Sequence, residues 1–319
     1  MTQKYAIDPA YKEFPDIPFS RKLWKLRLIN LLIVASRLRR KWAEDITVTK
    51  HKVRGVDGNN IKVIEVCRKG LKGMAPAIVY FHGGAFFMSY AGIHLDNAEM
   101  YARETGCRVF VVDYRLSTQA PFPASQDDSQ SVVEWIFDNA AQLNVDSDKL
   151  ILSGDSAGGC LAASCAQMTL DRNQQRKEKI NILAQFLIYP VTDCETKTKT
   201  AIEFTDTPIW THNANKIMWD VYLRGSDYKK GTEGAVIPKY ASPIHRKDFS
   251  NLPPAYIEPT EFDPLRDEAY NYGRALEAAG VAIEIVEAKG AVHGYEFVDC
   301  ETTRKYQKLR VDALKRFLV

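Results

Sequence analysis

The sequence predicts an α/β protein in which a mostly parallel sheet is covered by helices on both faces. From about residue 46, short β-rich apolar runs alternate with amphipathic segments of helical periodicity. Strands of a parallel sheet are buried on both faces, so they form continuous apolar runs of this kind. With 319 residues, 45% of them hydrophobic, the chain can bury such a sheet in a large core.

The expected strands are an antiparallel hairpin and six further runs. Residues 46–53 and 60–67 flank a V-D-G-N-N turn, which is typical of a hairpin. The other strand-like runs are residues 77–84, 108–114, 149–155, 184–190, 255–263 and 282–288. Amphipathic helices are expected between them or after them, at residues 94–105, 125–143, 157–172, 266–279 and 302–318.

Residues 22–42 lie before this alternation and predict a helix with one wide apolar face. Their uninterrupted apolar part, residues 31–35, is far shorter than a membrane-spanning helix. No acidic residue lies between residues 21 and 41, so the basic flanks leave binding to a membrane surface open. We expect this helix to pack on its own protein as a lid. The predicted apolar face comprises Trp24, Leu28, Leu31, Leu32, Ala35, Leu38 and Trp42.

A second segment, residues 191–240, interrupts the alternation and contains an aromatic-rich helical stretch at 207–223. Insertions of this kind lie over the carboxyl edge of an open sheet, where α/β proteins bind ligands. We therefore expect residues 1–45 to form N-terminal cap helices and residues 191–240 to form a cap insertion. Residues 46–190 and 241–319 are then the two parts of the catalytic core.

Composition and short motifs argue against several other classes of protein. The net charge of +3 gives no indication of a nucleic-acid partner, and the six cysteines contain no C-x-x-C pair. These thiols fit a reducing cytosol, and acidic residues precede the first apolar run, unlike in a secretory signal. No histidine pair has metal-ligand spacing with a carboxylate, and no phosphate loop ends in G-K-[ST]. We expect no metal and no cofactor.

The candidate nucleophile is Ser156, in the stretch ILSGDSAGG that follows a strand and opens a helix. Gly154 and Gly158 lie two positions on either side of Ser156, giving G-x-S-x-G. In a sharp strand-to-helix turn, larger side chains at these two positions would collide. Such a turn presents the serine hydroxyl at the edge of the sheet.

A serine hydroxyl needs a base to remove its proton and an acid to orient that base. His293 follows the last strand-like run, between small residues. Three acids follow the preceding strand: Glu261, Asp263 and Asp267. Asp263 stands at the strand end, before a proline suited to opening a helix, and is the preferred candidate. The order Ser156, Asp263, His293 is that of an α/β-hydrolase.

Backbone N–H groups for a developing oxyanion are expected at two places. Gly83 and Gly84 follow a strand in the segment YFHGGAFF, and Ala157 directly follows the nucleophile. His82 is a possible second base, but we expect its side chain to hydrogen-bond the loop backbone instead.

Six motifs occur in the order of one family. They are H-G-G-A-F at 82–86, D-Y-R at 113–115, F-P-A at 122–124 with Asp128, G-D-S-A-G-G at 154–159, D-P-L-R-D-E at 263–268 and H-G at 293–294. The chain thereby resembles the hormone-sensitive lipase family, the bacterial family IV esterases, over about residues 47–319. The resemblance implies an α/β-hydrolase core with a helical cap, which hydrolyses carboxylic esters without metal or cofactor.

The sequence departs from this family pattern in two places. Ala85 replaces a third glycine, and Ser117, Thr118 and Gln119 stand where the family usually carries Ala-Pro-Glu. The second departure puts a structural buttress in doubt rather than the chemistry.

The sequence therefore predicts a cytoplasmic serine carboxylesterase for short-acyl esters, with a small-molecule ester as its partner. It predicts no nucleic-acid partner and no stable membrane insertion, and it leaves the oligomeric state open. A peptidase or amidase, and a non-catalytic small-molecule binding protein on the same fold, are the alternatives. The residues expected to line the substrate pocket are Phe86, Trp210, Trp219 and Tyr222.

Overall fold

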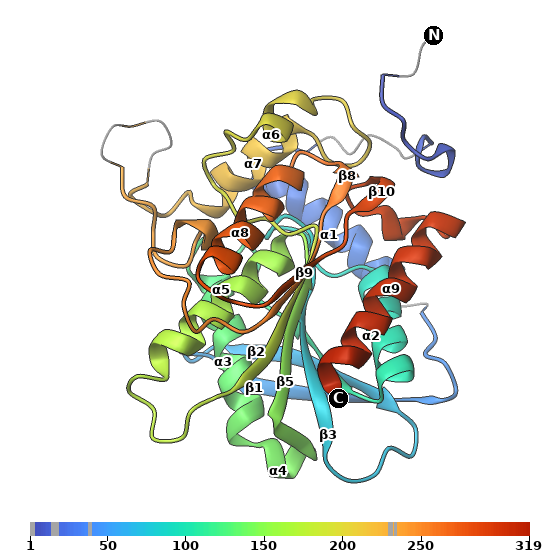
Figure 1. The fold of residues 1–319 in the computed structure, drawn as a ribbon, viewed down its shortest axis with the longest axis vertical. Helices are drawn as coiled ribbons and strands as arrows, with labels where there is room; N and C mark the ends of the chain where they lie inside the picture. Colours follow the sequence, from blue (N-terminus) through green and yellow to red (C-terminus); the bar gives the residue numbers. More distant parts are fainter. Residues whose placement is uncertain (1–3, 14–18, 38–39, 229–231, 233–234) are drawn as a thin grey trace.

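An eight-stranded sheet of order β1-β2-β4-β3-β5-β6-β7-β9 forms the centre of the protein (Figure 1). The computed structural model describes residues 4–13, 19–37, 40–228, 232 and 235–319. β2 pairs antiparallel with β1 and β4, and every further neighbouring pair is parallel. The strands are β1 (Ile46–Arg54), β2 (Asn60–Arg68), β3 (Ala75–Phe81), β4 (Arg108–Asp113), β5 (Val145–Asp155), β6 (Ile182–Ile188), β7 (Ala255–Glu258), β8 (Thr260–Phe262), β9 (Ile283–Ile285) and β10 (Ala288–Val292).

Helices cover both faces of this sheet, which confirms the predicted fold class. Along β3, Ala77, Val79 and Phe81 enter the core beneath α3, α5 and α8, whereas Ile78 and Tyr80 enter the core beneath α2 and α9. The helices are α1 (Leu23–Arg37), α2 (Gly92–Thr105), α3 (Ala124–Asp138), α4 (Ala140–Leu143), α5 (Ala157–Arg172), α6 (Lys199–Glu203), α7 (His212–Tyr222), α8 (Arg266–Ala278) and α9 (Glu301–Leu318).

The predicted strand at residues 255–263 is two strands. β7 belongs to the main sheet, whereas β8 pairs in parallel with β10 in a separate two-stranded sheet. Pro259 lies between them, and a proline has no N–H with which to continue the pairing. Phe262 is paired with Val292 in the small sheet, so the residues that follow these two, Asp263 and His293, emerge side by side.

The helix α1 lies with α6 and α7 at the end of the sheet where the parallel strands terminate (Figure 1). Polar side chains attach it to the loops after β3 and β4. The Asn30 amide donates to the Phe87 carbonyl at 2.7 Å, and its oxygen accepts from the Ser89 N–H at 2.7 Å. Arg27 donates to the Thr118 carbonyl at 2.9 Å.

The orientation of α1 differs from the prediction. Leu26 on its inner face is fully buried, but Trp24, Leu28, Leu31 and Leu32 are 61%, 53%, 67% and 66% exposed. The part of the predicted apolar face that lies in α1 therefore points outward, because Asn30 and Arg27 bind loop carbonyls from the other side of the helix. Trp42, assigned to the same face, lies beyond the end of α1 and is partly buried. Leu38, assigned to the same face, lies outside the described residues.

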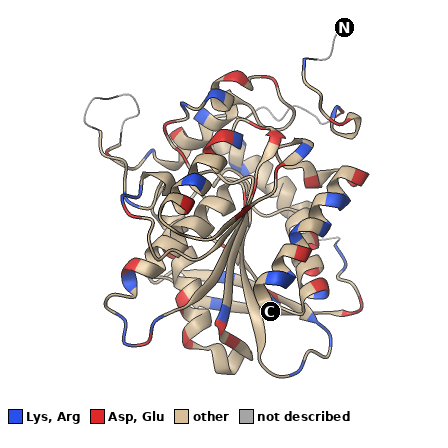
Figure 2. Ribbon diagram, viewed as in Figure 1, with Lys and Arg blue, Asp and Glu red and all other residues tan. Residues whose placement is uncertain are grey.

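Positive and negative side chains are mixed along most helices, as on α9 (Figure 2). Among the described residues, no helix has the length and apolar character needed to cross a membrane.

Candidate active site

Ser156 occupies the sharp turn between β5 and α5. Its backbone has φ 55° and ψ −119°, a conformation that a non-glycine residue rarely adopts. A Cβ on Gly158 would lie 1.9 Å from the Phe81 carbonyl oxygen, and one on Gly154 would lie 2.3 Å from Gly158 backbone atoms. Both positions therefore need glycine for the close approach of β5, α5 and β3.

The structure brings Ser156, His293 and Asp263 together in one hydrogen-bonded chain. The Ser156 hydroxyl lies 2.8 Å from His293 Nε2, and His293 Nδ1 lies 2.7 Å from Asp263 Oδ2. The Asp263 carboxylate also accepts from the Thr260 hydroxyl and the Leu265 N–H, each at 2.9 Å. Since a carboxylate accepts, His293 carries its proton on Nδ1 and accepts the serine proton at Nε2.

The two other candidate acids make different contacts. Glu261 accepts from the Gly290 N–H at 2.8 Å, next to the small sheet. Asp267 accepts from the Thr200 N–H at 3.0 Å and so fixes α6 to α8. Of the three acids, Asp263 is the one that contacts His293.

The loop after β3 corrects one predicted oxyanion donor. The Gly83 N–H donates to Asp155 Oδ2 at 3.0 Å, so it is directed at a buried carboxylate. Gly84 and Ala85 instead line the cavity that contains Ser156. Within the described part of the chain, no acceptor is bonded to the N–H of Gly84 or of Ala85. Ala85 has φ 55°, a left-handed conformation that favours the glycine it replaces.

Asp155, the residue before Ser156, ties this loop to β5. It accepts from the Tyr80 hydroxyl at 2.6 Å and lies 3.3 Å from His94 Nε2. Burial, the largest single effect, raises the pKa of Asp155, but the charge and hydrogen bond of His94 and the bond from Tyr80 together lower it below its usual value. Sequence reasoning missed this pair, although Asp155 lies inside the G-D-S-A-G motif.

His82 holds the loop backbone, as predicted. Its Nδ1 donates to the Gly83 carbonyl at 2.6 Å, and its ring stacks on Tyr114 with 4.3 Å between centroids. Complete burial lowers the pKa of His82 to about 3, so the ring is neutral near pH 7.

A cavity of about 290 Å³ contains Ser156 and His293. Trp210 lines it, with its ring 5.4 Å from the His293 ring. The other three predicted pocket residues do not line it: Phe86 stacks on Tyr222 at 3.9 Å, and Trp219 packs beside them in the core. Apolar residues that the sequence did not indicate complete the wall: Phe19, Ile29, Ile33, Met88, Ile209 and Phe297.

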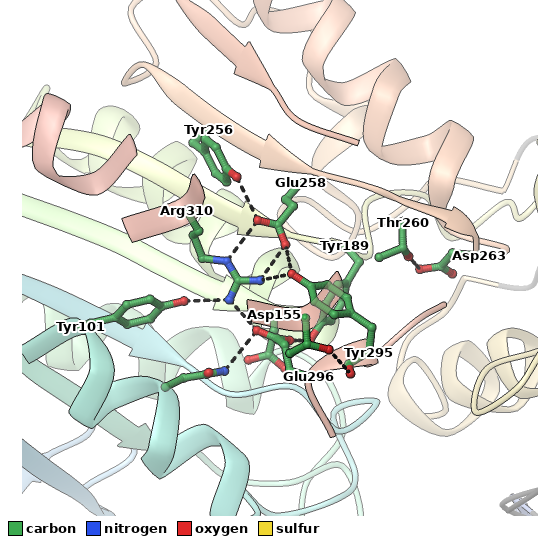
Figure 3. A network of polar contacts seen from close by, with 12 residues as sticks. Tyr101, Asp155, Tyr189, Tyr256, Glu258, Thr260, Asp263, Tyr295, Glu296 and Arg310 are labelled. Carbon is green, nitrogen blue, oxygen red and sulfur yellow. Dashed lines mark hydrogen bonds and ion pairs between the residues drawn. The ribbon is translucent and has the colours of Figure 1, made fainter. Parts of the chain in front are cut away.

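Figure 3 shows a buried polar network around Arg310. The fully buried Arg310 of α9 binds Glu258 at the end of β7 and Glu296, three residues after His293. Glu296 also accepts from the hydroxyl of Tyr189, whose ring lies 4.8 Å from the His293 ring. The network connects the loop that carries His293 to the main sheet. No sequence pattern indicated this network, because its cation is one arginine in an amphipathic helix.

One cluster of the described residues has the side chains of a metal site. Asp193, Cys194 and His245 bring their ligand-type atoms within 4.8 Å of one another. His245 donates a hydrogen bond of 2.9 Å to Asp193. This bond is the largest contribution to the pKa of His245, which is raised to about 10. An ion pair thus accounts for the arrangement, and none of the three residues lines the catalytic cavity.

Comparison with known proteins identifies the family of this chain. The model of a family with the alpha/beta hydrolase fold matches residues 78–297. This chain belongs to that α/β-hydrolase family. The predicted resemblance to the hormone-sensitive lipase branch is confirmed as well.

Several named relatives of this α/β-hydrolase are esterases. Carboxylesterase NlhH and esterase LipI of Mycobacterium tuberculosis are each 34% identical over 69% of this chain and 66% of their own length. The match thus spans slightly less than two thirds of these relatives. A bacterial heroin esterase structure aligns over 98% of both chains with a TM-score of 0.88 and 28% identity. An esterase from Pyrobaculum calidifontis covers 96% of this chain and 94% of its own, with a TM-score of 0.78 and 29% identity. These names support the predicted class of enzyme, a carboxylic ester hydrolase.

Proposed function

We propose that the chain is a serine carboxylesterase for short-acyl esters, with Ser156, His293 and Asp263 as its triad. The observation that carries this proposal is the continuous hydrogen-bonded chain from Ser156 through His293 to Asp263, at 2.8 and 2.7 Å, opening into an apolar cavity. The esterase relatives support the reaction type.

The proposed reaction passes through an acyl-enzyme. The Ser156 hydroxyl attacks the ester carbonyl while His293 Nε2 takes its proton, and Asp263 stabilises the resulting imidazolium. The tetrahedral intermediate then collapses, the C–O bond to the alcohol breaks, and His293 returns the proton to the leaving oxygen. Water repeats the sequence on the acyl-enzyme and releases the acid and free Ser156.

We assign the oxyanion contacts to the N–H groups of Gly84, Ala85 and Ala157. The first two residues line the cavity, and Ala157 begins α5 directly after the nucleophile. Helix N-termini and unpaired backbone N–H groups stabilise a developing negative charge. Gly83 is left out because its N–H is bonded to Asp155.

The expected substrates are small because the cavity is small. Its volume of about 290 Å³ lies at the lower end of the range for ligand pockets. We also propose the division of the chain stated above, with residues 1–45 and 191–240 as cap and the rest as core.

The test is a matched set of single variants assayed with p-nitrophenyl butyrate. Ser156→Ala should lower kcat on the order of 10⁴-fold with the fold retained. Asp263→Asn should also lose most activity, because it favours the wrong His293 tautomer, whereas Glu261→Gln is the control at a neighbouring acid. An organophosphonate should label wild type at Ser156. Turnover retained by Ser156→Ala would contradict the triad, and ester binding without turnover in wild type would favour a binding protein.

A further inference from the structure

The outward face of α1 is an apolar surface that the described residues leave exposed to solvent. Trp24, Leu28, Leu31 and Leu32 project from it, each more than half exposed. The flanking Lys22 and Lys25 make no ion pair with any described residue. An amphipathic helix with leucines, a tryptophan and lysines is the composition of helices that lie in a membrane interface.

The β1–β2 hairpin beside α1 carries unpaired positive charge. Lys50 and Lys52 project from one face of β1, and Lys52 stands directly opposite Lys62 of β2. Like charges at opposed positions in a sheet destabilise it. Asp113 faces Lys62 across the β2–β4 pairing, but in the described ranges no carboxylate forms an ion pair with any of these three lysines.

A groove of about 920 Å³ joins these two features into one surface. Leu31 and Val34 of α1 line one side, and Lys50, Lys52 and Lys62 line the other. An apolar ridge and a row of lysines therefore face solvent side by side. The opposite face of α1 supplies Ile29 and Ile33 to the catalytic cavity, so the surface lies one helix diameter from that cavity.

We infer that α1 and the lysine face of the hairpin dock this protein on a bilayer that contains anionic phospholipid. The leucines and Trp24 would enter the interface, and the lysines would contact the phosphate groups of the lipid. A second copy of the chain is a poorer occupant, because a two-fold contact pairs this surface with itself and brings no anionic group to its lysines. This inference goes beyond the proposed esterase activity and does not depend on it.

The experiment is flotation of the full chain with vesicles of phosphatidylcholine alone and of phosphatidylcholine mixed with phosphatidylglycerol. We expect binding to the mixed vesicles, weakening as salt screens the lysines. Leu28→Gln/Leu31→Gln/Leu32→Gln and Lys50→Gln/Lys52→Gln/Lys62→Gln should each lower the partition coefficient at least about tenfold. The emission of Trp24, obtained as the difference between the spectra of wild type and Trp24→Phe, should shift to the blue on binding.

Matched controls carry the same changes elsewhere on the surface. Two triple variants, at exposed apolar residues and at exposed lysines, should bind like wild type: Met74→Gln/Ile202→Gln/Leu309→Gln and Lys69→Gln/Lys72→Gln/Lys177→Gln. Thermal unfolding by circular dichroism verifies the fold of every variant.

Three results would overturn the inference. These are the absence of binding to mixed vesicles at low salt, equal binding by the test and control variants, and equal binding to neutral and mixed vesicles. Self-association of wild type that the leucine triple variant abolishes, without vesicle binding, would instead assign the surface to a second copy.

Discussion

Replacing Arg310 by methionine should destabilise the protein strongly and in a pH-dependent manner. All five N–H groups of the guanidinium are bonded: to Glu258 at 3.1 and 2.6 Å, to Glu296 at 2.5 Å, and to the hydroxyls of Tyr101 and Tyr295 at 3.0 and 2.9 Å. Methionine fills most of the volume but leaves two buried carboxylates without a cation. Removing one member of a buried ion pair costs about 3–5 kcal/mol, and Arg310 serves two acids, so we expect about 4–5 kcal/mol.

The sign of the pH dependence follows from the two acids. In Arg310→Met, Glu258 and Glu296 are buried at low cost only when they are protonated, whereas in the unfolded chain they ionise above about pH 4.3. The folded variant then holds protons that the unfolded variant releases, so its stability falls as pH rises from about 5 to about 8. Wild type, which retains Arg310, is the reference for this slope.

Urea unfolding at these two pH values measures both effects. The variant Arg310→Met/Glu258→Gln/Glu296→Gln, which removes the uncompensated charges, should regain at least half of the lost stability. Glu296→Gln alone leaves Arg310 paired with Glu258 and weakens the contact to Tyr189, so it tests the link to His293. A loss below about 1 kcal/mol in Arg310→Met, or an equal loss at both pH values, would refute the proposed role of the ion network.

Three further outcomes are expected. Across esters from acetyl to palmitoyl, each buried CH₂ should lower the activation free energy for kcat/KM by about 0.8 kcal/mol, so kcat/KM should rise at first. It should drop beyond about six to eight carbons, when the acyl chain outgrows the cavity, and a maximum at lauroyl or longer would contradict this. Ala85→Gly should retain activity and raise the free energy of unfolding by about 1 kcal/mol, because glycine adopts φ 55° without strain; urea unfolding that shows a loss would contradict the strain argument. Asp193 raises the pKa of His245, so the protonated histidine stabilises the folded state below about pH 6.5, and this stabilisation is lost as pH rises toward 10. In thermal unfolding at several pH values, Asp193→Asn should remove about 1 kcal/mol of this pH dependence, and an unchanged slope would contradict it.

Local sterics explain why much of the fold and the candidate triad could be predicted. The strand-to-helix turn at Ser156 depends on glycine at two fixed positions, and this requirement is written in adjacent residues. The adjacency of Asp263 and His293 also has a local origin, since each follows a strand of the same small parallel pair. Apolar runs of strand length located the sheet because burial on both faces requires them.

The errors arose where tertiary contacts decide. The glycine spacing suggested two free N–H groups, but the direction of the Gly83 N–H is set by Asp155, 72 residues away. Aromatic content suggested that Phe86 and Tyr222 line the pocket, whereas they stack on each other in the core. The periodicity of α1 identified a helix with an apolar face but did not determine whether that face would point toward the core or toward solvent.

The contacts of α1 make it part of the catalytic site rather than a separable cover. Asn30 binds the backbone at both Phe87 and Ser89, in the same loop that carries the proposed donors Gly84 and Ala85. If α1 moved outward, two backbone groups of this loop would lose their partners and the cavity would lose the wall formed by Ile29 and Ile33. Any ligand held on the outer face of α1 therefore acts on a helix whose inner face fixes the loop of the proposed oxyanion donors. The geometry of the proposed ester hydrolysis and the position of α1 therefore depend on each other.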